Sequence, residues 1–217
     1  MDQLNEILNG IAVNTQSSIR ITAGGRTVYV DPLEIAGEPR DADAVFITHA
    51  HGDHFSPADI AKVMKNGAVL VLPESMADRA GEVPGNFSVL TVVPDGQYEA
   101  AGVSFETTPA YNRLKPFHPK KNRWVGYILV LDGIRIWIAG DTDATPEAAS
   151  VKCGVAMVPV GGTYTMTASE AAALVNRVKP AAAIPTHYGT IVGKESDADT
   201  FAKLVDPSIK VEIKKEY

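Results

Sequence analysis

Two β-hairpin patterns, each followed by an acidic residue, constrain most strongly how this chain can fold. The flanking strands are expected at residues 18–22 with 27–30 and at residues 126–131 with 134–138. Gly24-Gly25 lies in the first turn and Asp132-Gly133 forms the second, and both are typical of antiparallel hairpins. Asp31 follows the first hairpin and Asp141 follows the second. The pattern predicts a chain built from two similar, hairpin-led halves.

Strands alternating with helices follow each hairpin. Short apolar strands are expected at residues 44–47, 155–160 and 181–184, and further helices at residues 2–9 and 197–204. Ser56 and Thr167 are each followed three residues later by an acid, Asp59 and Glu170, which predicts a capped helix start at both places. Hairpins with interleaved helices indicate an α/β fold, in which β-sheets pack face to face and helices cover them outside.

Length and composition favour one domain spanning residues 1–217. Of these residues 45% are hydrophobic, which is enough for a substantial core. The formal net charge of −6 disfavours both nucleic acid and an anionic membrane surface as binding partners, because binding polyanions requires clustered cations. The acidic N-terminus lacks the pattern of a secretory signal, and no apolar run is long enough to span a membrane. We therefore expect a cytoplasmic protein, for which a homo-oligomer is left open.

Cys153 is the single cysteine, so no internal disulfide can form. A catalytic thiol would need a nearby histidine base. The apolar neighbours Val151, Val155 and Ala156 favour an inert, buried thiol instead.

The densest group of potential ligands lies just after the expected strand at residues 44–47. His49, His51, Asp53 and His54 place three imidazoles and one carboxylate within six positions, in a chain with five histidines. Zinc and similar ions favour this mixture of nitrogen and oxygen donors. A solvated, histidine-rich loop is the alternative, but the concentration of donors favours a metal centre.

The motif His49-x-His51-x-Asp53-His54 resembles that of the metallo-β-lactamase superfamily. Gly140-Asp141-Thr142 and Pro185–Gly189 are similar to the later motifs of that family. Residues 159–166 resemble the corresponding stretch of its ascorbate-6-phosphate lactonase-like branch. The resemblance implies a four-layer αββα fold, in which helices flank two packed mixed β-sheets.

The same resemblance implies two divalent metal ions and their ligands. The first ion would be held by His49, His51 and a later histidine, the second by Asp53, His54 and His187, with Asp141 bridging both. His118 is the only histidine between the first motif and Asp141, although an exposed loop histidine is the alternative there. Zinc is the expected metal, and manganese, nickel or iron also suit these donors.

Two positions depart from the pattern of this branch. Gln16 and Ile138 stand where its members often carry histidine. Neither departure removes an implied ligand, so they affect the surroundings of the site and the choice of substrate.

The ligand set predicts a hydrolase that acts through a metal-bridging hydroxide. Two ions about 3.5–4 Å apart can hold such a nucleophile at neutral pH and polarise the bond that it attacks. Asp53 is the candidate catalytic residue, because a carboxylate there could orient the hydroxide or relay a proton. The branch resemblance favours a lactone or ester, and a small phosphodiester is the alternative.

A cluster of cations surrounds His118 in this otherwise acidic chain. It consists of Arg113, Lys115, Lys120, Lys121 and Arg123. Such a cluster predicts a small anionic substrate. The two arginines and Lys115 are the main candidates to bind it. Tyr164 and Tyr188 are further candidates for the pocket. A merely solvated loop is the alternative.

Two other classes of protein are less consistent with the motifs. Di-iron redox members of this fold resemble His-x-Glu-x-Asp at the first motif, whereas this chain has His51 in the glutamate position. They also need a flavin module, which is absent from this sequence. A metal-binding scaffold without catalysis is disfavoured because no ligand position is lost.

Overall fold

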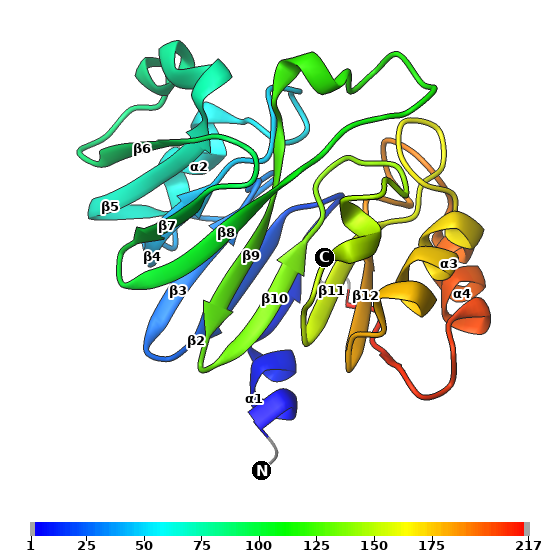
Figure 1. The fold of residues 1–217 in the computed structure, drawn as a ribbon. Coiled ribbons are helices and arrows are strands. Elements are labelled where there is room, and N and C mark those ends of the chain that lie inside the picture. Colours follow the sequence, from blue (N-terminus) through cyan, green and yellow to red (C-terminus); the bar gives the residue numbers. More distant parts are fainter. Residues whose placement is uncertain (1–2, 215–217) are drawn as a thin grey trace.

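Two mixed β-sheets pack face to face in the computed structural model, which describes residues 3–214 (Figure 1). Sheet A has the order β1-β2-β3-β4-β5-β6, with β1 at Ile11–Val13, β2 at Ile19–Ala23, β3 at Arg26–Val30, β4 at Ala42–Phe46, β5 at Met64–Pro73 and β6 at Ser88–Val92. Sheet B has the order β13-β12-β11-β10-β9-β8-β7, with β7 at Gln97–Ala100, β8 at Val103–Pro109, β9 at Val125–Leu131, β10 at Ile134–Ile138, β11 at Val155–Pro159, β12 at Ala182–Thr186 and β13 at Lys210–Val211.

Each sheet joins an antiparallel hairpin to a run of parallel strands. The hairpin β2–β3 pairs Ile19 with Val30, and the hairpin β9–β10 pairs Ile134 with Leu131, so both predicted hairpins are confirmed. Strands β3 to β6 are parallel, and so are β10 to β13. Because β8 and β10 are both antiparallel to β9, they share one direction. The carboxyl ends of β8, β10 and β12 therefore lie at the same edge of sheet B.

Helices cover the outer faces of both sheets. The α-helices are α1 at Gln3–Gly10, α2 at Pro57–Val63, α3 at Ala168–Val178 and α4 at Glu195–Leu204, and the short 3-10 helices are η1 at Glu74–Glu82, η2 at Lys120–Asn122 and η3 at Ala148–Ser150. In Figure 1, α3 and α4 lie side by side beyond β11 and β12. An apolar cluster joins α3 and α4 to sheet B, and another joins α2 and η1 to sheet A. The predicted αββα architecture is thus confirmed.

The helix starts expected from the sequence are present, with one difference. At α3, Thr167 and Glu170 form both bonds of a capping box. At α2, Ser56 Oγ accepts from the backbone N–H of Asp59. The Asp59 carboxylate does not return to the backbone of Ser56; it accepts from the N–H groups of Glu34 and Ile35 at 3.0 and 3.1 Å. It thereby fastens the loop after β3 to α2.

Aromatic side chains lock the sheets together beneath the loops that follow β4. The Phe46 ring lies 5.1 Å from that of Phe105 and 5.2 Å from that of Tyr127 between centroids, both at steep angles. Such edge-to-face pairs add to the free energy gained by burial. The Tyr127 hydroxyl donates to the carbonyl of Ile47 at 2.6 Å. Sheet B therefore holds the backbone two residues before His49.

None of the helices within residues 3–214 has the length and apolar character needed to cross a membrane.

Candidate metal centre

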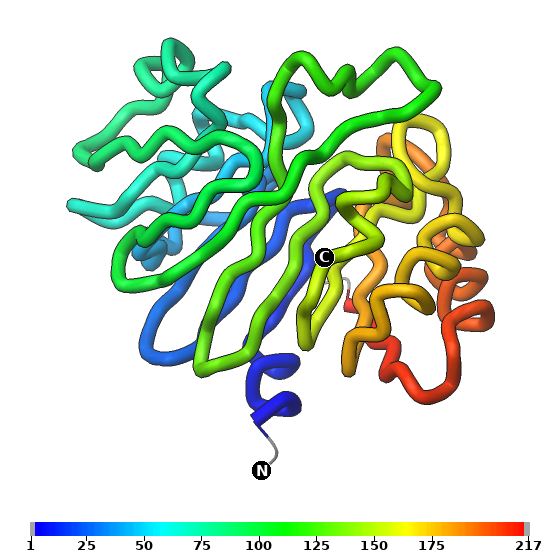
Figure 2. The backbone as a smooth tube through the Cα atoms, in the orientation of Figure 1, coloured from blue at the N-terminus to red at the C-terminus, as the bar shows by residue number. Residues whose placement is uncertain are grey.

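The seven predicted ligands lie on loops that follow strands at one edge of the sheets. Residues 49–54 follow β4, His118 lies between β8 and β9, Asp141 follows β10 and His187 follows β12. Figure 2 shows the loop between β8 and β9 arching over the top of the molecule, beside the loops before α3 and after β12. Hydrogen bonds join these loops, since Asn112 Nδ2 donates to the carbonyl of Tyr164 at 2.9 Å.

One group of nitrogens is formed by His49, His51 and His118. One nitrogen from each ring lies within 4.8 Å of the other two. His49 Nε2 and His51 Nδ1 are 3.1 Å apart, so these two nitrogens face the same point. The three residues are those predicted for the first ion, and their role as ligands stays a prediction.

A second group combines Asp53, His54 and His187. One donor atom from each lies within 4.8 Å of the others. Asp53 Oδ2 is 3.5 Å from His54 Nε2 and 3.3 Å from His187 Nε2. This is the set predicted for the second ion.

The Asp141 carboxylate lies between the two groups. Its Oδ2 is 3.2 Å from His118 Nε2 in the first group and 3.3 Å from His187 Nε2 in the second. Its Oδ1 is 3.5 Å from His54 Nε2. One carboxylate thus reaches both sets of donors, as a bridging ligand would.

The donor atoms fit bound cations. Nε2 of His54, His118 and His187 and Oδ1 of Asp141 are buried and have no hydrogen-bond partner within residues 3–214. Leaving buried polar atoms unpaired costs free energy, so such a cluster calls for an explanation. Divalent ions that accept imidazole and carboxylate donors would satisfy all four atoms.

Electrostatics favour positive charge at this point. Burial lowers the pKa of His54, but the nearby carboxylates of Asp141 and Asp31 outweigh it and raise the pKa to about 9. Burial opposes ionisation of Asp141, yet His187 and His54 hold its pKa well below the usual value. Burial, with the neighbouring His54, lowers the pKa of His49, which keeps its ring neutral and able to donate an electron pair.

Comparison with known proteins identifies the family. Residues 11–187, which include all seven predicted ligands, match the beta-lactamase superfamily domain. The chain belongs to the metallo-β-lactamase superfamily. It is 34% identical over 209 residues to a UPF0173 metal-dependent hydrolase of Pyrococcus abyssi, covering 88% of this chain and 90% of that protein. The corresponding protein of Thermococcus onnurineus is 32% identical over 207 residues, with the same coverage.

A solved structure agrees with this assignment. A protein from Parabacteroides distasonis superposes with a TM-score of 0.77 and 30% identity, covering 94% of this chain and 91% of that chain. The protein is therefore a member of the UPF0173 metal-dependent hydrolase family within the metallo-β-lactamase superfamily.

In this family member, Asp31 hydrogen-bonds to the candidate ligand His54 and to Thr48, on the side away from the other donor atoms. Its buried carboxylate accepts from His54 Nδ1 at 2.7 Å and from the backbone and hydroxyl of Thr48 at 2.8 and 2.6 Å. The Thr48 hydroxyl, having donated to Asp31, can accept from His49 Nδ1 at 2.9 Å. Asp31 was expected only to end a hairpin. Its position after β3, matching that of Asp141 after β10, was the available signal.

Asn112 has the same relation to His118. Its Oδ1 accepts from Nδ1 and from the backbone N–H of His118, at 2.9 and 3.0 Å. Its Nδ2 donates to Asp143 Oδ1 at 3.1 Å. The His118 ring is therefore buried and held in one orientation rather than exposed on a loop. No sequence pattern pointed to Asn112.

Trp124 forms an aromatic wall beside the first group of nitrogens. Its ring lies 4.9 Å from that of His49 and 5.0 Å from that of His51 between centroids. This contact was also missed, because a tryptophan at the start of a strand is more often part of the core.

The cations predicted to bind substrate fall into two classes. Lys115 is 3.0 Å from Asp143 Oδ1 and also donates to the carbonyl of Thr165, so it fastens the loop. Arg113 and Arg123 are exposed, and neither forms an ion pair in the described part of the chain. Of the three cations predicted to bind substrate, the two arginines thus remain available for that role.

The two predicted tyrosines occupy different surroundings. The half-buried Tyr164 packs its ring against exposed Phe117, with 4.7 Å between centroids. Tyr188 is buried in the apolar cluster beneath α3 and α4. Its packing there gives no support to a substrate contact.

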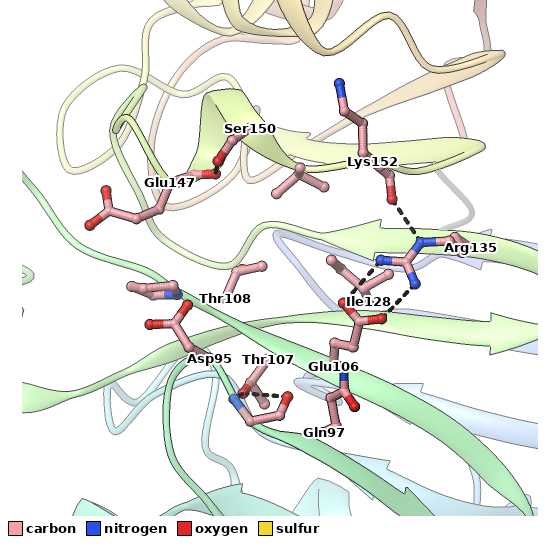
Figure 3. A pocket seen from close by; sticks show the side chains of 13 residues that line it. Asp95, Gln97, Glu106, Thr107, Thr108, Ile128, Arg135, Glu147, Ser150 and Lys152 are labelled. Carbon is pink, nitrogen blue, oxygen red and sulfur yellow. Dashed lines mark hydrogen bonds and ion pairs between the residues drawn. The ribbon is translucent and has the colours of Figure 1, made fainter.

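A cavity of about 390 Å³ on the outer face of sheet B is separate from the metal centre (Figure 3). None of the seven predicted ligands lines it. Arg135 and Glu106, which point into it, form an ion pair at 2.6 Å. This cavity is therefore distinct from the candidate metal centre at the edge of the sheets.

Proposed function

We propose that this chain is a binuclear metal-dependent hydrolase that cleaves a small anionic substrate of the lactone or ester type. The observation that carries the proposal is the position of Asp141, whose carboxylate lies 3.2–3.3 Å from a histidine of each donor group. A carboxylate shared by two complete donor sets is what a two-ion site requires.

The residues have separate tasks in this proposal. When bound, the two ions supply an activated water and stabilise negative charge that develops on the substrate. Asp53 contacts His54 and His187 through Oδ2, which leaves Oδ1 to orient the attacking water or to pass a proton to the leaving group. Although burial opposes it, the nearby imidazoles of His187 and His54 lower the pKa of Asp53, so this carboxylate is ionised at neutral pH.

The substrate class rests on two supports. The resemblance to the ascorbate-6-phosphate lactonase-like branch favours a lactone, and the exposed arginines on the loop that carries His118 favour an anionic group. A small phosphodiester is the second candidate, because paired ions also support in-line attack at phosphorus. Zinc is the proposed metal, the single domain spans residues 1–217, and a location in the cytoplasm stays a prediction.

A panel of substrates tests the proposal. The protein is loaded with zinc or manganese and assayed on phosphorylated lactones, neutral lactones, esters and phosphodiesters. We expect the highest kcat/KM for an anionic lactone and no turnover by Asp141→Asn. Preference for a phosphodiester would replace the lactone proposal. If protein that holds two ions turned over no substrate of the panel, the proposed hydrolase activity itself would be overturned.

The two arginines are predicted to bind the anionic group. The double change Arg113→Gln with Arg123→Gln should raise KM about tenfold or more for an anionic substrate, since charged hydrogen bonds contribute about 1–3 kcal/mol each. A neutral ester should be unaffected. Arg177→Gln, on the exposed side of α3, is the control for loss of charge alone. An equal, small effect on both substrates would mean that the arginines are only solvated.

A further inference from the structure

One nitrogen of the metal centre stands apart from its equivalents. His49, His54 and His118 each have Nδ1 within 2.9 Å of an oxygen, supplied by Thr48, Asp31 and Asn112 respectively. His187 Nδ1 is equally buried but has no hydrogen-bond partner within residues 3–214. Its Nε2 faces Asp53 and Asp141, so Nδ1 is the nitrogen that points away from the proposed ion.

The side chain of Gln16 also lacks hydrogen-bond partners, and its carboxamide could supply the acceptor that His187 Nδ1 lacks. It is 2% exposed, and both atoms of its carboxamide, Oε1 and Nε2, are buried without a hydrogen-bond partner in the described part of the chain. A buried amide in this state is costly, because it has lost its water without gaining another partner.

A backbone hydrogen bond brings Gln16 and His187 close to each other. The N–H of His187 donates to the carbonyl of Gln16 at 2.8 Å. Both residues adopt the left-handed region, with φ of 49° at Gln16 and 57° at His187, which side chains of this kind rarely do. A Cβ on Gly161 would lie 2.3 Å from the carbonyl oxygen of His187, so the backbone there is tightly enclosed. The backbone of His187 is therefore held in place, while the Gln16 side chain keeps three rotatable bonds.

We propose that Gln16 is the positioning residue for His187. When the second ion is bound, a turn of the Gln16 side chain would let Oε1 accept the Nδ1 proton of His187 and so would fix the tautomer and direction of the ring whose Nε2 would hold that ion. This inference rests on the proposed two-ion site. Histidine ligands of metals commonly donate their other N–H to such an acceptor, and loss of the acceptor typically weakens metal binding about 10–100-fold.

Two substitutions separate this role from a structural one. Gln16→Met keeps the length of the side chain but removes the amide, leaving only a weakly accepting sulfur. It should lower the zinc affinity of the second site about 10–100-fold. It should also raise the Tm of the metal-free protein by about 2–4 °C, because an unpaired buried amide has been removed. Gln16→Glu keeps an acceptor, so its zinc affinity should stay within a few-fold of the wild-type value. The Tm of this variant without metal should be lower than that of metal-free wild type.

Zinc titration against a chromophoric chelator measures both sites, and thermal unfolding of chelator-treated protein gives the Tm. Gln97→Met, at an exposed position in β7, is the matched control and should change neither quantity. The positioning role is established if Gln16→Met lowers the zinc affinity and raises the metal-free Tm, while Gln16→Glu retains the zinc affinity. Unchanged affinity in Gln16→Met, or affinity and Tm falling together in both variants, overturns it. Failure of the wild-type protein to bind a second zinc ion would instead overturn the two-ion proposal and this inference with it.

Discussion

Individual side chains behind the candidate ligands decide how the metal centre is organised. Asp31 and Asn112 each turn one imidazole so that its Nε2 faces Asp141. The four donors of residues 49–54 could be predicted because they are adjacent in the sequence and chemically rare. Asp31 and Asn112 could not, because they are common residue types whose role depends on a partner that only the fold brings close.

Removal of the charge behind His54 tests this organisation. Asp31→Asn keeps the volume but weakens the bond to His54 Nδ1, so zinc affinity at the second site should fall about tenfold or more. Chelator competition measures the affinity. Asp41→Asn, which removes the charge of a surface ion pair with Arg20, should have no effect. Equal zinc affinities for Asp31→Asn and wild type would contradict the role given to Asp31.

The thiol of Cys153 should be inert, as its apolar neighbours indicate. Burial raises the pKa of this half-buried thiol to about 12, so it is almost entirely protonated at pH 8. Only the thiolate reacts readily with iodoacetamide. Mass spectrometry should therefore show much slower labelling of the folded protein than of protein in denaturant. Rapid labelling of the folded protein at pH 8 would contradict this assignment.

Among the elements, the hairpins, the capped helices and the buried parallel strands β4, β11 and β12 could be predicted, whereas strands β5 to β8 could not. Asp132-Gly133 specifies the β9–β10 turn, and Thr167 with Glu170 specifies the start of α3. Strands β5 to β8 carry no comparable local motif. In β5, Ala68–Leu72 is a continuous apolar run, which does not distinguish a buried strand from a helix by periodicity. Contacts with neighbouring strands settle that choice.

The loop between β8 and β9 depends on one carboxylate for its shape. Asp143 accepts from Asn112 Nδ2, from the backbone N–H of Arg113 and from Lys115 Nζ, at 2.8–3.1 Å. Asp143→Ala should weaken the first zinc site, because Asn112 then holds His118 less firmly. It should also lower the Tm by several degrees, since each such bond contributes about 1–3 kcal/mol.

Zinc titration and thermal unfolding of Asp143→Ala measure these effects. Asp199→Ala, on the exposed side of α4, serves as the control. If Asp143→Ala matched this control in both measurements, the loop would not depend on Asp143.

At the scale of the whole molecule, the candidate metal centre joins the two sheets. Residues 49–54 follow a strand of sheet A, whereas His118, Asp141 and His187 follow strands of sheet B. Each proposed ion therefore takes ligands from both sheets. The resemblance of the motifs predicted this ligand set, and the fold brings its members within a few ångströms of one another.

Metal content tests the central claim most directly. Purified protein is saturated with zinc, dialysed to remove loosely held ions and subjected to elemental analysis alongside quantitative amino-acid analysis. Two groups of three candidate ligands, with Asp141 between them, predict two zinc ions per chain. One ion per chain, or none, would contradict the binuclear site.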